Sequence, residues 1–100
     1  MRQRSTNVRG GAFSAAEIEA VWNKGTIISG YDAAVWRRDA CGTPMKRFDY
    51  GQTTQYGWEI DHIRPVAHSG GDEMSNLQPL QWESNRFKGD NWPNWSCKVA

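Results

Sequence analysis

The sequence predicts one small α+β domain with an N-terminal helical segment and a strand, loop, strand and helix near the C-terminus. Two observations carry this prediction. Apolar residues recur at helical spacing after residue 14, whereas residues 58–63 alternate in the strand period. A chain of 100 residues, 38% of them hydrophobic, has room for one compact core. We therefore expect a single domain.

Residues 1–13 are predicted to form a flexible basic arm that precedes a domain spanning residues 14–100. The arm has no apolar period and contains Gly10 and Gly11, and it holds three arginines and no acidic residue. The rest of the chain has 12 − 3 = 9 basic against 11 acidic residues. A non-specific grip on phosphate is therefore expected from the arm and from local clusters. A solvated tail with no binding role remains the alternative for the arm.

The first predicted helix begins at Ser14. Ser14 and Glu17 fit a capping box, and an apolar face follows until residues 24 and 25 stop the run. Asp32 is a candidate cap for a second short helix through residues 35–37, which would end before Cys41.

Hairpin strands are predicted between residues 45 and 63, where aromatic and polar residues alternate around two glycines. The alternating segment 58–63 stops at Pro65, and the polar loop that follows contains a Gly–Gly pair for a sharp reversal. Residues 76–80 predict a short return strand, with Pro79 requiring an unpaired edge position. Residues 82–88 have helical composition, and Gly89 provides the C-terminal stop.

Cys41 and Cys97 lie far apart in the sequence and form no CxxC pair, so we expect free buried thiols. Trp92 and Trp95 are expected to pack back and close the core. No apolar stretch is long enough to span a membrane and no signal peptide is evident, which predicts a cytoplasmic protein.

Residues 61–85 contain the groups that a hydrolytic site needs. Such a site requires a proton acceptor for water, a metal that offsets developing charge, and a rigid group that orients both. His62 lies fourteen residues before Asn76, which lies nine residues before Asn85. With six asparagines in 100 residues, chance fills both positions with a probability of roughly 0.4%, so the spacing is informative.

The run WEIDHIRPVAHSGGDEMSNLQPLQWESNRFKGD resembles the HNH endonucleases of the ββα-metal (His-Me finger) superfamily, of the small bacterial or phage type. The match includes Asp-His, the Gly-Gly loop, Asn-Leu-Gln-Pro-Leu and the closing Asn-x-x-Lys-Gly-Asp. It covers about a third of the chain closely, so it is far more specific than a match to the three residues His, Asn and His alone would be. The resemblance implies a ββα-metal motif at about residues 57–90 within a single nuclease domain.

Carried onto this chain, the resemblance implies that His62 is the general base and that Asn76 orients the loop and the base. It also makes Asp61 and Asn85 the metal ligands. One carboxylate and one amide oxygen suit a loosely held Mg²⁺, with Mn²⁺, Zn²⁺ or Ni²⁺ as alternatives.

Three basic residues are candidates for binding substrate phosphate. Lys88 lies three residues after Asn85, on the same helix face, and Arg64 and Arg86 are further candidates. His68 is a weaker candidate for substrate contact. Relatives often carry paired CxxC motifs that this chain lacks, so no structural zinc is expected. Packing by three tryptophans is expected in its place: Trp36, Trp58 and Trp82.

Adjacent residues of a regular strand point to opposite faces, so Asp61 and His62 would share one site only if the strand ends or bulges there. We therefore expect the strand to lose its regularity at these two residues. Glu59 and Asp72 are expected to be ordinary surface charges.

The leading hypothesis is a metal-dependent endonuclease that hydrolyses phosphodiester bonds, most simply in double-stranded DNA. The alternative is a nucleic-acid-binding module that keeps the scaffold but does not cleave. The sequence leaves open DNA against RNA, sequence preference, nicking against double-strand cleavage, and oligomeric state.

Overall fold

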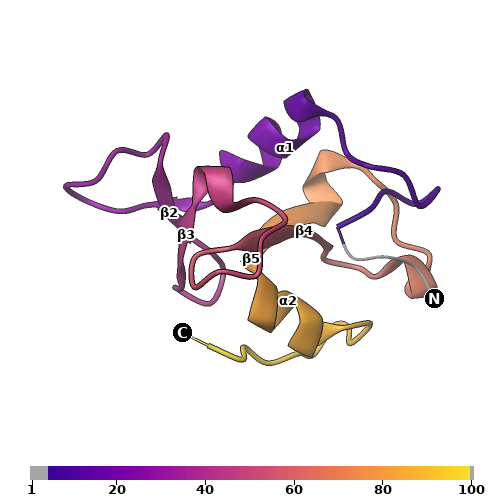
Figure 1. Cartoon of the computed structure of the whole chain (residues 1–100). Helices are drawn as coiled ribbons and strands as arrows, with labels where there is room; N and C mark the ends of the chain where they lie inside the picture. The colour runs from indigo at the N-terminus through magenta and orange to yellow at the C-terminus, as the bar shows by residue number, and fades with distance from the viewer. Residues whose placement is uncertain (1–4, 100) are drawn as a thin grey trace.

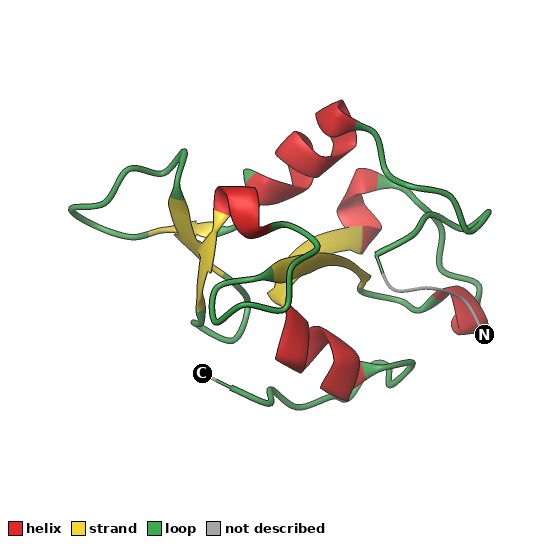
Figure 2. Ribbon diagram, in the orientation of Figure 1, coloured by secondary structure: helices red, strands yellow, loops and turns green. Residues whose placement is uncertain are grey.

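A computed structural model describes residues 5–99 of the chain. The two-stranded sheet β4–β5 lies between two helices, α1 on one side and α2 on the other, and the small sheet β1–β2–β3 lies beside it (Figures 1 and 2). The helices and strands are α1 Ala15–Trp22, β1 Thr26–Ile27, β2 Trp36–Arg38, β3 Pro44–Lys46, β4 Trp58–His62, β5 Leu77–Gln81 and α2 Trp82–Lys88. Three short 3₁₀ turns complete the fold: η1 Arg47–Asp49, η2 Val66–His68 and η3 Met74–Asn76. Within residues 5–99, no helix combines the length and the apolar character needed to cross a membrane.

The N-terminal helix begins where the capping signal predicts. Ser14 Oγ accepts from the Glu17 amide at 3.1 Å, and the Glu17 carboxylate accepts from the Ser14 amide at 2.8 Å. Both halves of the capping box are therefore formed. Val21 and Trp22, on the apolar face, are buried.

The second predicted helix is wrong, because residues 36–38 form strand β2. The Asp32 carboxylate caps only a turn, accepting from the Ala34 amide at 2.9 Å. The chain then becomes extended and pairs with a strand on each side. Arg37 lies opposite Ile27 of β1 and opposite Met45 of β3. Pairing with segments distant in sequence outweighs the local helix signal.

The predicted strand, return strand and helix near the C-terminus are confirmed. Strand β4 pairs antiparallel with β5 over its whole length, from Trp58↔Gln81 to His62↔Leu77. Among residues 5–99, no strand pairs with the other side of β5, so Pro79 lies on an edge, as expected. Helix α2 ends at Gly89, which has a positive φ of 53° and whose amide donates to the Asn85 carbonyl.

The core lies between α1 and β4–β5, and two tryptophans dominate it. The rings of Trp22 and Trp58 pack at a centroid distance of 5.2 Å, and both residues are fully buried. The other core members are Phe13, Val21, Met45, Ile60 and Leu77. Trp36, Trp82 and Trp95 are only partly buried, and Trp92 is 39% exposed, so the expected core closure by Trp92 is wrong.

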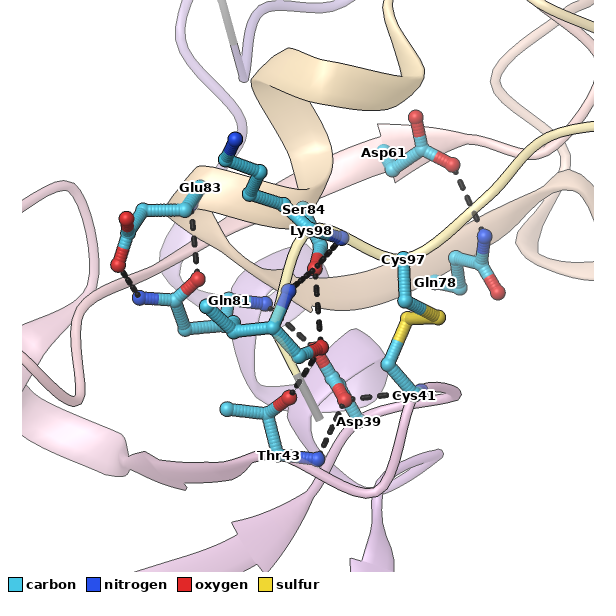
Figure 3. The surroundings of a disulfide bond; sticks show 11 residues. Asp39, Cys41, Thr43, Asp61, Gln78, Gln81, Glu83, Ser84, Cys97 and Lys98 are labelled. Atoms are coloured by element: carbon cyan, nitrogen blue, oxygen red, sulfur yellow. Dashed lines mark hydrogen bonds between the residues drawn. A yellow bond between two sulfur atoms is a disulfide. The ribbon is translucent and has the colours of Figure 1, made fainter.

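The two cysteines form a disulfide, which corrects the prediction of free thiols. The C-terminal tail runs back past α2 to the loop after β2, where Cys97 joins Cys41 (Figures 1 and 3). Ser84 of α2 holds this tail, because its Oγ accepts from the Lys98 amide at 3.0 Å. Local spacing carries no signal for such a return. Disulfides are rare in cytosolic proteins, so the bond is in tension with the expected cytoplasmic location.

Residues 5–13 lie against the domain, in contrast to the flexible arm expected from composition. Ser5 Oγ accepts from the Ile60 amide at 2.9 Å and lies 2.7 Å from the Tyr50 hydroxyl. Thr6 pairs with Ala12 in an isolated antiparallel β-bridge, and the Phe13 side chain packs in the core. Arg2 and Arg4 of the predicted arm fall outside the described residues.

Candidate functional site

The candidate site is built around strand β4, all five residues of which are buried. Side chains alternate along a strand, so Trp58, Ile60 and His62 share one face, whereas Glu59 and Asp61 share the other. No bulge interrupts the strand at these residues, because Asp61 pairs with Gln78 and His62 with Leu77 in regular register, but β4 ends at His62, as one form of the prediction required. Asp61 and His62 therefore lie on opposite faces of the strand end.

Asp61 lies in a polar layer between the β4–β5 sheet and α2. Its Oδ2 accepts from Gln78 Nε2 at 2.9 Å, and its Oδ1 lies 3.2 Å from Lys88 Nζ (the Asp61–Gln78 bond is drawn in Figure 3). Asp61 is 6% exposed. Burial raises the pKa of Asp61 above its ordinary value, although the bond from Gln78 and the charge of Lys88 oppose this effect.

Asn85 of α2 lies in the same layer, one turn before Lys88. Its side-chain amide donates to Glu59 Oε1 at 2.8 Å, while Arg86 donates to Glu59 Oε2 at 3.0 Å. Glu59 is only 4% exposed, so its interpretation as a surface charge is wrong. The strand period was a usable signal, because it places Glu59 on the same face as Asp61.

The three basic candidates for phosphate binding are placed differently from one another. Lys88 is fully buried and donates to the His62 carbonyl at 3.0 Å. The predicted phosphate contact would need an exposed ammonium, which Lys88 does not have in this structure. Arg86 is paired with Glu59. Arg64 is exposed and packs its guanidinium over the Trp92 ring at 5.0 Å from the centroid.

His62 lies at the end of the apolar face, with its ring 6.1 Å from that of Phe13. Its Nε2 lies 2.8 Å from Asp72 Oδ1. Asp72 was therefore wrongly interpreted as an ordinary surface charge. No spacing rule relates these two residues, because their contact depends on how the intervening loop folds.

Asn76 joins the two ends of the loop that follows β4. Its Oδ1 accepts from the Arg64 amide at 2.8 Å, and its Nδ2 donates to the Gly71 carbonyl at 2.9 Å. Gly70 allows this closure, since a Cβ there would lie 1.7 Å from the Arg64 carbonyl oxygen. His68, in the same loop, bonds the Asp90 carbonyl at 3.0 Å.

The residues of the polar layer fit a hard divalent cation by their chemistry. Asp61 supplies carboxylate oxygens, and Asn85, whose amide nitrogen is turned to Glu59, has its carbonyl oxygen directed away from Glu59. Carboxylate and amide oxygens are the donors that Mg²⁺ prefers. Within residues 5–99, no group of three or more His, Cys, Asp or Glu side chains is arranged to hold a metal. A cation here would therefore depend on water and substrate oxygens for most of its ligands.

A family model described as HNH endonuclease matches residues 40–91, just over half of the chain. The matched range contains β4, the loop closed by Asn76, β5 and α2. No curated protein and no solved structure matches the chain.

Proposed function

This chain belongs to the HNH endonuclease family, and we propose that it is a metal-dependent endonuclease that hydrolyses phosphodiester bonds in DNA. We further propose that β4, β5 and α2 form its ββα-metal core. One observation carries the proposal: Asp61 and Asn85 both lie in the polar layer between β4 and α2, and His62 follows Asp61 at the end of the same strand.

Asp61 and Asn85 are the residues that would hold the cation. When bound, the cation would offset the negative charge that develops on the phosphate and on the departing 3′ oxygen. Mg²⁺ suits these oxygen donors best, and Mn²⁺, Zn²⁺ and Ni²⁺ are the alternatives. Lys88 keeps the Asp61 carboxylate paired within the buried layer. A ligand set this small predicts weak cation binding in the absence of DNA.

His62 accepts the proton of the attacking water in this proposal. Such a base contributes about 10²- to 10⁴-fold in rate. Because Asp61 and His62 lie on opposite faces of the strand end, the scissile phosphate would lie across that end, between the two faces. Asn76 would keep the loop beyond His62 closed, and exposed Arg64 is the best-placed contact for a neighbouring phosphate.

The alternative function is a binding module that holds nucleic acid without cleaving it. One contact favours this alternative: the Lys88 ammonium already lies on Asp61 Oδ1, where a cation would have to share the carboxylate. The modest net charge of +1 is compatible with both functions.

Plasmid cleavage in Mg²⁺, in Mn²⁺ and in EDTA tests the proposed activity. We expect conversion of supercoiled plasmid to nicked or linear forms with metal and none in EDTA. Asp61→Asn serves as the matched variant, because it keeps the shape of the side chain but removes the carboxylate charge. Cleavage that persists in EDTA would refute the proposal. So would the absence of cleavage with all four cations: Mg²⁺, Mn²⁺, Zn²⁺ and Ni²⁺.

A further inference from the structure

His62 is held from two sides, by Phe13 of the N-terminal segment, which lies outside the matched range, and by Asp72 of the loop after β4, which lies inside it. The Phe13 ring lies against one side of the imidazole, and the Asp72 carboxylate bonds its Nε2. The His62 side chain is only 9% exposed, so these neighbours set the orientation of its ring.

The chemistry of Asp72 fixes which imidazole nitrogen carries the proton. An ionised carboxylate only accepts hydrogen bonds, so Nε2, 2.8 Å from Asp72 Oδ1, must be the donor. In a neutral imidazole the other nitrogen is then an acceptor. The pairing therefore directs the basic lone pair of His62 to Nδ1, the atom that would then accept a proton from water.

Asp72 is itself held by the N-terminal segment. The Val8 amide donates to both carboxylate oxygens of Asp72 at 3.2 Å. Val8 lies within a tight turn in which the Asn7 carboxamide accepts from the amides of Arg9 and Gly11, both at 3.0 Å. The turn thus presents a fixed backbone donor to a carboxylate that is 64 residues away in sequence.

We propose that Asp72 is a positioning residue for His62 that fixes the Nε2–H tautomer and leaves Nδ1 to accept the proton of water, with the turn at residues 7–11 holding the Asp72 carboxylate. This inference rests on the proposed nuclease function for its catalytic consequence. The tautomer itself is a property of the folded chain without metal or DNA. The N-terminal segment is accordingly part of the site and not only a means of attracting phosphate.

Nitrogen-15 NMR of the imidazole rings tests the pairing directly, in EDTA and in a pH series carried upward until the ring nitrogen shifts no longer change. The chain has two histidines, so a His68→Gln variant assigns the His62 signals. We expect the Nε2–H form to predominate in the wild-type protein and a mixture of both tautomers in Asp72→Ala. A wild-type spectrum dominated by the Nδ1–H form would overturn the proposal, and so would an Asp72→Ala spectrum identical to the wild type.

Cleavage kinetics test the consequence. Asp72→Ala should lower kcat by about tenfold to a hundredfold, by analogy with the carboxylate partners that orient metal-bound histidines, with little change in KM. Glu73→Ala is the matched control, because it removes the same charge from the next, exposed position of the same loop. Equal losses in the two variants would overturn the positioning role. A wild-type protein that does not cleave would refute the proposed function instead, and the spectra would still decide the pairing.

Discussion

The two faces of β4 are both buried, yet they are stabilised by opposite means. One face carries Trp58 and Ile60 into the apolar core. The other carries Glu59 and Asp61 against α2, where each carboxylate is bonded by side chains of the neighbouring elements. The comparison shows that a single five-residue strand can support a core and a charged layer at once, provided every buried charge is paired.

The difference also separates stability from chemistry. The apolar face loses stability in proportion to the volume removed, whereas the polar face is sensitive to which charges are left without a partner. His62 ends the apolar face, so the proposed base is oriented partly by core packing. Four predictions test this division, from the largest expected effect to the smallest.

Removing the Trp58 ring should produce the largest loss of stability. Trp58→Ala opens a cavity in the core and is expected to lower the free energy of unfolding by about 3–5 kcal/mol in urea titrations. Trp92→Ala is the control, because Trp92 is 39% exposed. Similar losses in the two variants would contradict the placement of the core.

Breaking the charge pair on the opposite face should cost slightly less and should be recoverable. Lys88→Met leaves Asp61 without its ammonium partner, which is expected to cost about 3 kcal/mol in EDTA. Adding Asp61→Asn removes the stranded charge, so the double variant should regain much of that loss. Strictly additive losses, measured by the same urea titrations, would show that the two side chains do not stabilise each other.

His62→Ala should separate cleavage from binding. We expect the cleavage rate to fall by at least about a hundredfold, because the proton acceptor is lost. DNA binding measured in EDTA should be retained. His68→Ala is the matched control, since its imidazole bonds a backbone carbonyl at the loop surface. Comparable cleavage by His62→Ala and the wild type would reassign the base.

Tyr50, which packs edge-on against Trp58, gives the smallest and a pH-dependent effect. Tyr50→Phe removes the hydroxyl bonded to Ser5 and should cost about 1 kcal/mol near neutral pH. Burial raises the pKa of Tyr50 above its ordinary value of 10.0. Stability from the neutral hydroxyl is therefore present below pH 10.0 and is lost as the pH rises through the folded-state pKa. The gap between wild type and variant should narrow in alkaline urea titrations, and a constant gap would contradict the shift.

The elements that the sequence predicted correctly are those with local signals at their ends. Ser14 and Glu17 mark the start of α1, and Gly89 marks the end of α2. Strand β4 follows from alternation and a nearby proline. Strand β2 was missed because its extended form depends on partners in β1 and β3, which no local pattern around Asp32 reveals.

The candidate site divides in the same way. Motif spacing singles out His62, Asn76 and Asn85, but it does not identify the side chains that hold them. Asp72 reaches His62 only because the loop closed by Asn76 folds back, and Val8 reaches Asp72 from the far end of the chain. The burial of Glu59 could have been predicted from the strand period, if α2 had been placed over that face of β4.

The bond between Cys41 and Cys97 encloses β3, β4, β5 and α2 in one covalent ring, with 56 residues separating its ends. In the loop-entropy description, closing a ring of that length lowers the conformational entropy of the denatured chain and so stabilises the fold by about 4 kcal/mol. That figure is a large part of the stability of a small domain, which is typically about 5–15 kcal/mol. The stability of the whole β4–β5–α2 unit therefore depends on the redox state of its surroundings. A strongly reducing medium would shorten the lifetime of the folded domain without changing any residue of the candidate site.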